Sequence, residues 1–239
     1  MSTNSLFSVF FLQDINSIIQ SFLPGTMGKH WKDPDTAAKA GHLHLLHNFT
    51  QNGQYCTRAG IDWAIEFQHE EVFYYLLKQG ISWSENALGM VSFNGNTNIL
   101  GKMLEMRTHR FSNHHADVAA SKGNIKAVYI FYENGLKCTH NGANLAAKDG
   151  HIDMLRILHT EYGVKCSDYG FFIAAKTNRP KVIKYLMDEQ GLNCSSTITD
   201  VAIRLKCKDV VNFLISRGIY GTLEGWTYPL PERFYTFTA

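Results

Sequence analysis

Hydrophobic residues along the chain recur with a helical spacing. Val182, Ile183 and Leu186 stand at positions i, i+1 and i+4, and the same spacing returns in other parts of the sequence. It places these side chains on one stripe of a helix, whereas a strict alternation would indicate a strand. Short segments with small side chains, such as Leu-Ala-Ala at 145–147, precede the stripes. The pattern predicts short helices in pairs, with a tight turn inside each pair.

The predicted helix pairs repeat at a nearly constant interval. The residue at the turn inside each pair, here called the turn residue, marks the repeat. The successive turn residues are Gly41, Gln68, Gly95, Gly123, Gly150, Asn178 and Lys206, and their separations are 27, 27, 28, 27, 28 and 28 residues. A pair of short helices cannot bury its apolar face alone. Seven such units therefore predict a stack in which each pair packs against its neighbours.

A second set of positions runs in phase with the first. Most units end in a glycine, here called the closing residue, which is followed three residues later by Cys or a large aromatic residue. Gly80 with Trp83 and Gly135 with Cys138 are examples. We expect the closing glycine to adopt the left-handed conformation that ends the second helix. The third unit keeps the aromatic residue, Phe111, but has no glycine before it.

The segment from Asn144 to Leu158 resembles an ankyrin repeat in its Leu-Ala-Ala, its Gly-His and its apolar second helix, and the resemblance extends over residues 32–221. The units lack the Thr-Pro-Leu-His opening and are shorter than the ankyrin unit of about 33 residues. The missing residues fall where the family carries projecting β-hairpin fingers. The resemblance therefore implies an all-α, ankyrin-type solenoid of about seven helix-turn-helix repeats with reduced or absent β-hairpin fingers. Compact units of this kind also look like those of ankyrin proteins from large DNA viruses.

The segments at the two ends lie outside the repeats. Residues 1–31 carry apolar residues at i, i+3, i+4, i+7 and i+8, which predicts an amphipathic helix that caps the first repeat. Residues 11–24 also resemble the first helix of an F-box, the motif that recruits cullin-type ubiquitin ligases. Residues 222–239 are rich in aromatic residues and predict a cap at the other end. The expected organisation is thus 1–31, 32–221 and 222–239.

Composition and charge exclude several classes of function. Lys and Arg number 23 against 21 Asp and Glu, so the chain has no basic excess for binding nucleic acid. No apolar run approaches the ~18 residues of a membrane span, and the stretch 7–12 lacks the features of a signal peptide. The five cysteines, an odd number, fit a reducing compartment. We expect a cytoplasmic monomer that binds no membrane and no small-molecule substrate, and that uses no cofactor.

Cysteines and histidines occupy fixed positions in the repeat. Cys56, Cys138, Cys166 and Cys194 share one position with Trp83 and Phe111, which predicts apolar wedges between repeats. His42, His69 and His151 follow the turn residue, where the Gly-His pair of the ankyrin family links successive turns. Two histidine groups, at 42–47 and 114–115, lack Cys or carboxylates at ligand spacing, so no metal site is expected.

An acidic or amide residue recurs six positions before the turn residue. These residues are Asp35, Asp62, Asp117, Asn144 and Asp200. We expect their side chains to accept hydrogen bonds from free N–H groups at the start of a short helix. The alternative is a row of acids along the inner face of the stack that faces a basic partner.

The resemblance implies a non-catalytic protein-binding module, and no catalytic motif is present. The candidate partner-binding residues lie just before the turns: Glu66, Phe67, Phe93, Asn94, Lys122, Lys148, Asp149 and Lys176. Phe67 and Phe93 are the sharpest candidates, because an aromatic residue in a mostly polar set can serve as an anchor. The alternative is that they pack under a neighbouring helix.

Three further points bear on function. A substrate adaptor of a cullin-type ubiquitin ligase, recruited through residues 11–24, is the alternative function. If the viral resemblance holds, the partner is a host protein. The third repeat also breaks the pattern, because residues 107–115 form a locally basic loop.

Overall fold

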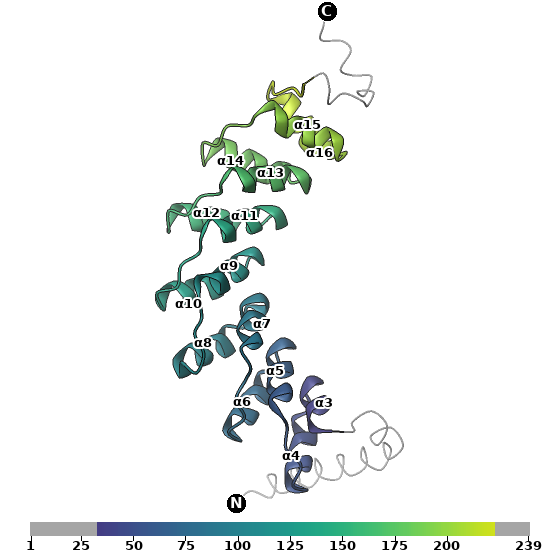
Figure 1. Cartoon of the computed structure of the whole chain (residues 1–239), viewed down its shortest axis with the longest axis vertical. Coiled ribbons are helices and arrows are strands. Elements are labelled where there is room, and N and C mark those ends of the chain that lie inside the picture. Colours follow the sequence, from purple (N-terminus) through teal and green to yellow (C-terminus); the bar gives the residue numbers. More distant parts are fainter. Residues whose placement is uncertain (1–32, 223–239) are drawn as a thin grey trace, which may run out of the picture. The chain divides into compact units, whose positions relative to one another are not determined.

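The computed structural model describes residues 33–222, and these form helices and connecting loops with no strand among them (Figure 1). The chain divides into two units, residues 1–87 and 88–239, and each is described by itself. The predicted caps at 1–31 and 222–239, apart from Thr222, and the F-box-like segment at 11–24 lie outside the described residues.

The fourteen helices of the described chain form seven consecutive pairs, as the repeat predicts. In the first unit the pairs are α3 (Pro34–Lys39) with α4 (Leu43–Gln51), and α5 (Arg58–Glu66) with α6 (Glu70–Lys78). The third pair is α7 (Asn86–Asn94) with α8 (Thr97–Met106), and α7 contains the boundary between the units. The remaining pairs are α9 (Asn113–Ser121) with α10 (Ile125–Glu133), α11 (His140–Asp149) with α12 (Ile152–Thr160), α13 (Asp168–Lys176) with α14 (Pro180–Asp188), and α15 (Ser196–Arg204) with α16 (Lys208–Ser216).

Within each unit the first helices of the pairs pack on one another, and so do the second helices. In the second unit α11 packs between α9 and α13, while α14 packs between α12 and α16 (Figure 1). The first helices approach closely because they meet through alanines: Ala146 and Ala147 are both fully buried. Leu155 and Leu158, on the predicted apolar stripe of α12, are also fully buried. The apolar core is therefore continuous from one pair to the next.

Every turn residue has a left-handed backbone. The φ angles range from 55° at Asn178 to 92° at Gly150. Four of the seven are glycines, which adopt this conformation without a steric penalty, and the other three are Gln68, Asn178 and Lys206. The closing residues behave in the same way, and Arg107, with φ of 50°, takes the place of the glycine in the third repeat. The expected left-handed ends of the second helices are thus confirmed.

The predicted wedge position is buried between repeats. Trp83, Cys138 and Cys166 are at most 5% exposed, and Cys56 and Cys194 are partly buried. The thiols of Cys138 and Cys166 donate to the carbonyls of Ala116 and Ala143, at 3.4 and 3.5 Å, in the preceding first helices. All five cysteines are free thiols. The four at the wedge position act as small apolar residues that fill the space between neighbouring pairs.

The predicted role of the acidic and amide residues needs a correction. Asp117 is the fifth residue of α9, so it does not cap its own helix. Its carboxylate instead accepts hydrogen bonds from the backbone N–H of Thr139 (2.6 Å) and the hydroxyl of Thr139 (2.7 Å), the N-cap residue of α11 in the next repeat. Side chains at the same repeat position accept a bond from the backbone N–H of a residue 22 or 23 positions later, and these side chains are Asp35, Asp62, Asp117, Asn144 and Asp200. We call this series the inter-repeat ladder.

Two members of the ladder are too deeply buried to belong to an open acidic row. Asp117 and Asn144 are each only 4% exposed, so a partner cannot reach them. A glycine in the first turn of the following helix makes room for the carboxylate: a Cβ at Gly142 would lie 2.5 Å from Oδ1 of Asp117. Asp117 and Asn144 therefore join repeats and are not accessible to a basic partner.

We expect Asp117→Ala to lower the free energy of unfolding by about 1–3 kcal/mol, because it leaves the N–H of Thr139 without its acceptor. Asp117→Asn should restore most of that loss, since Oδ1 of Asn144 accepts the equivalent bond from the N–H of Ser167 while its Nδ2 donates to the Ser167 hydroxyl. Asp153→Ala, at an exposed helix start, is the control and should cost less than about 1 kcal/mol. Denaturant unfolding measures all three. An Asn variant as unstable as the Ala variant would contradict the hydrogen-bond explanation.

Stability should also fall at alkaline pH. Burial raises the pKa of the Cys138 and Cys166 thiols from 9.0 to about 12. The unfolded chain therefore loses these protons near pH 9 while the folded chain keeps them, so the stabilisation present below pH 9 is lost as the pH rises towards 12. Burial also raises the pKa of Tyr132 to about 12, with the same sign.

The double variant Cys138→Ala/Cys166→Ala isolates the thiol contribution. Its unfolding midpoint should fall less between about pH 8 and pH 10.5 than that of the natural protein. Equal falls in both proteins would show that the thiols ionise as easily in the folded chain as in the unfolded one.

Candidate functional site

The candidate residues lie at one end of the helix pairs, here called the turn edge. It comprises the two residues before each turn residue, the turn residue itself and the two residues after it. The side chain after the turn residue reaches back to the carbonyl two residues before the turn of the preceding repeat. This bond joins His69 to Lys39 (3.0 Å), Asn124 to Phe93 (2.8 Å), Arg179 to Lys148 (3.2 Å) and Cys207 to Lys176 (3.4 Å). The predicted linking role of the position is therefore confirmed, and four different residue types perform it.

The imidazoles at this position also lie against the preceding turn. A Cβ at Gly41 would lie 2.6 Å from Nδ1 of His69, and one at Gly123 would lie 2.8 Å from Nδ1 of His151. Glycine at these turns thus serves both the left-handed backbone and the close contact with the ring. Histidine here has a structural role. Among residues 33–222 no group of three or more His, Cys, Asp or Glu side chains could hold a metal ion.

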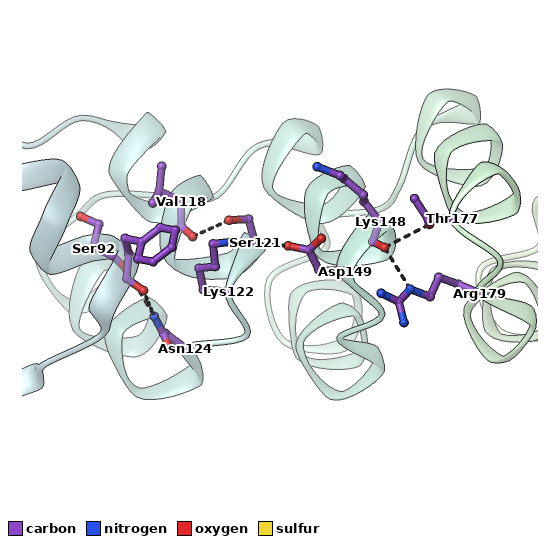
Figure 2. Close-up of polar contacts among 10 residues, drawn as sticks. Ser92, Val118, Ser121, Lys122, Asn124, Lys148, Asp149, Thr177 and Arg179 are labelled. Atoms are coloured by element: carbon purple, nitrogen blue, oxygen red, sulfur yellow. Dashed lines mark hydrogen bonds and ion pairs between the residues drawn. The ribbon is translucent and has the colours of Figure 1, made fainter.

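Figure 2 shows the turn edge of the second unit, where the bonds of Asn124, Thr177 and Arg179 to backbone carbonyls cross between repeats. Lys148 offers its carbonyl to two donors, the hydroxyl of Thr177 at 3.1 Å and Nε of Arg179 at 3.2 Å. These bonds fix the backbone before the turn. The side chain of Lys148 remains exposed to solvent.

Phe67 and Phe93 are both exposed, which excludes the alternative that they are buried under a neighbouring helix. The exposed fraction is 45% for Phe67 and 52% for Phe93. The other candidates divide into two groups. Glu66, Lys122, Lys148 and Lys176 are exposed, and Asn94 and Asp149 are partly buried. Of these two phenylalanines, Phe67 lies at the turn edge of the first unit, residues 1–87, and Phe93 at that of the second unit, residues 88–239.

A lysine lies over each of these rings. Nζ of Lys122 is 4.5 Å from the centre of the Phe93 ring, and it also lies 3.7 Å from a carboxylate oxygen of Asp149. In the first unit Nζ of Lys39 is 5.4 Å from the centre of the Phe67 ring and 5.2 Å from that of Trp63. Such cation–π contacts contribute about 0.5–1 kcal/mol at exposed sites and orient the ring. Lys122 and Lys39 thus each hold a cation above an exposed aromatic ring.

The structure adds residues that the sequence analysis did not propose. Lys39 belongs to the turn edge of the first repeat, but its contact with Phe67 crosses to the next repeat. The last repeats contribute further exposed cations, which are Arg179, Arg204, Lys206 and Lys208. Each of these residues stands at a turn residue or within two positions of one, so the repeat pattern could have identified them as members of the turn edge. Lys122 with Asp149 is one ion pair of this edge, and Asp209 accepts a hydrogen bond from Asn178 at 2.8 Å.

The turn edge of the last repeats therefore carries more basic than acidic groups, although the whole chain has a net charge of only +2. A shallow hollow of about 200 Å³ lies at the turn edge of the third and fourth repeats, lined by Gly95, Asn124 and the segment 125–127. The turn edge thus combines an exposed aromatic ring, a hollow and exposed basic side chains. Such features are suited to contact with a protein surface.

Comparison with known families supports the assignment of the fold. Residues 143–224, which include all of α12 to α16, match the family model of ankyrin repeats, in three copies. No catalytic family was found, and no curated protein matches the chain. Neither comparison connects the chain with proteins of large DNA viruses.

Ankyrin repeats generally serve as non-catalytic modules for protein–protein interaction. No helix among residues 33–222 is long and apolar enough to cross a membrane. The helix pairs that precede residue 143 share the turn geometry and the inter-repeat ladder of the matched region. The chain therefore contains ankyrin repeats at 143–224, and its described part has the fold of an ankyrin-type helical solenoid.

Proposed function

We propose that the protein is a non-catalytic binding module that contacts a partner protein through its turn edge. The observation that carries this proposal is the pair of exposed phenylalanines, Phe67 and Phe93, each with a lysine over one face. Neither ring fills the core, so folding does not account for an aromatic residue at either position. Half-exposed aromatic rings that become buried on association are the residues that contribute most to protein interfaces.

The neighbouring side chains define the chemistry of the partner. Lys148, Lys176 and Arg204 are exposed along the same edge of the second unit. Asp149, the acid beside Lys122, is already engaged by that lysine at 3.7 Å. A partner that places an apolar group on Phe93 and acidic groups along the basic repeats would complement this surface in shape and in charge.

The rigid backbone of the edge favours binding by pre-organisation. Links between repeats hold the carbonyls of Phe93 and Lys148, so the exposed side chains extend from a fixed frame. A surface that is already ordered loses little conformational entropy when it binds. The remaining candidates, Glu66, Asn94 and Asp149, would then contribute to specificity at the border of the interface.

The double variant Phe67→Ala/Phe93→Ala should lose its partner while keeping its fold. We expect recovery of the partner to fall at least about tenfold, because each truncated aromatic anchor weakens the interface by more than about 1 kcal/mol. The melting temperature should change by less than about 2 °C, since both rings are largely exposed. Affinity capture from a eukaryotic lysate with quantitative mass spectrometry measures the first quantity, and a thermal melt measures the second.

Tyr55→Ala/Tyr220→Ala is the matched control, because these tyrosines are 61% and 59% exposed and lie in loops away from the turn edge. The control should capture the same partner as the natural protein. A fall of many degrees in the melting temperature of the phenylalanine variant would show that the rings belong to the core. Unchanged capture by that variant would place the interface elsewhere.

The same experiment tests the ligase-adaptor hypothesis, which rests on the F-box-like sequence at 11–24. A chain that lacks residues 1–25 is captured in parallel. Recovery of cullin-ligase components by the full chain alone would support the adaptor function, with the repeats as the substrate-binding part. Recovery of one non-ligase partner by both chains would support the turn edge alone. The viral and host-protein hypothesis rests on the short repeat unit and predicts a host protein among the captured partners.

A further inference from the structure

The third repeat ends differently from the others. Its closing residue, Arg107, has φ of 50°, where six other repeats have a glycine with φ between 68° and 81°. The left-handed conformation is unfavourable for a residue with a side chain and free of steric cost for glycine. Glycine would serve the turn better at this position, so the turn itself does not require the arginine side chain.

The loop after Arg107 is also longer by one residue. Four positions separate Arg107 from Phe111, whereas three separate Gly135 from Cys138 in the next repeat. An open cavity of about 540 Å³ lies between this loop and the end of α10. The cavity lies within the second unit and at the end of the second helices that is remote from the turn edge. Its volume is within the range of small-molecule sites.

The cavity has an apolar part and a basic part. Leu104, Phe111 and Leu136 supply apolar surface. The ring of Phe111 is held by Phe131 and His115, with ring centres 5.6 and 5.3 Å apart. Phe111 is therefore a fixed surface that an apolar group can contact.

Arg107 and Arg110 supply the positive charge, and His109 and Asn134 complete the polar lining. Both arginines are exposed, and among residues 33–222 neither guanidinium forms an ion pair. Of the nearby acids, Glu105 is bound by Lys102 at 2.9 Å, and the exposed Glu133 precedes Asn134 but does not line the cavity. Two free guanidinium groups beside an apolar surface form an anion site that also accepts an apolar stem.

We propose that this cavity binds a phosphate monoester on an apolar stem, with the phosphate between Arg107 and Arg110 and the stem against Phe111. Two guanidinium groups match a doubly charged phosphate better than a single carboxylate. The site is independent of the turn-edge interface. Its ligand is either a small phosphate ester or a phosphorylated side chain of a protein, since both present the same group.

Titration of the full chain with phenyl phosphate, followed by calorimetry, tests the site. We expect saturable binding with a dissociation constant below about 1 mM. Inorganic phosphate, which lacks the stem, should bind about tenfold more weakly, and phenol, which lacks the charge, should not bind. A blocked tripeptide with a central phosphotyrosine distinguishes the two sources: tighter binding than phenyl phosphate indicates a protein ligand, and equal binding indicates a small ester.

Arg107→Gly separates binding from folding. The variant restores the glycine of the other repeats, so its melting temperature should stay the same or rise by up to about 3 °C. Its affinity for phenyl phosphate should fall at least about tenfold, and Arg110→Gln should cause a similar loss. Arg58→Gln removes an exposed arginine outside both the cavity and the turn edge and should leave the affinity unchanged.

Three outcomes would overturn the proposal. One is the absence of binding at about 10 mM phenyl phosphate. Another is equal loss of affinity in Arg58→Gln and Arg107→Gly, which would mean that only general positive charge attracts the anion. The third is a melting temperature of Arg107→Gly several degrees below that of the natural protein, which would show that the arginine side chain stabilises the fold.

Discussion

The hydrogen bond between an acidic or amide side chain and the start of the following repeat is the interaction that most of the stack shares. Four of the six junctions between the described repeats have it, and Gly89 and Phe172 occupy its position at the other two. It joins residues 22 or 23 positions apart, as between Asp117 and Thr139, and so fixes where the next first helix begins. Once that start is fixed, Ala146 and Ala147 face the alanines of α9, and Cys138 lies in the space between the two pairs. The ladder thus determines the register in which the apolar surfaces meet.

The two left-handed positions of each repeat solve a local geometric problem. A helix pair of fewer than 30 residues must reverse direction twice with almost no loop, and a left-handed residue ends a helix within one position. Glycine is preferred for this, but Gln68, Asn178 and Lys206 also adopt the conformation. The surrounding packing therefore supplies enough energy to tolerate a few unfavourable residues, which is what allows Arg107 to replace a glycine.

The structural and the proposed functional parts of the molecule share the same short segments. At the turn edge the backbone carbonyls are used to join repeats, while the side chains of the same residues extend into solvent. Phe93 is an example: its carbonyl accepts a bond from Asn124, and its ring is exposed beneath Lys122. This division lets the exposed side chains vary without disturbing the stack.

Much of the architecture follows from the sequence alone, because it is specified by local chemistry that recurs in every repeat. The spacing of apolar residues determines the helix pairs, and the glycine positions determine the left-handed turns. The Cys and aromatic position similarly indicates a buried wedge. Each of these needs only the residues of one unit and the knowledge that units repeat.

Only the tertiary structure decided what crosses from one repeat to the next. The sequence suggested that Asp117 caps a helix, and this was wrong in one respect: the helix belongs to the following repeat, 22 residues away. The cation over Phe67 comes from Lys39 of the preceding repeat, and the exposure of Phe67 and Phe93 depends on how closely neighbouring helices approach. A periodic sequence specifies the unit and its phase, but distances between side chains of different units arise from packing, which no local pattern contains.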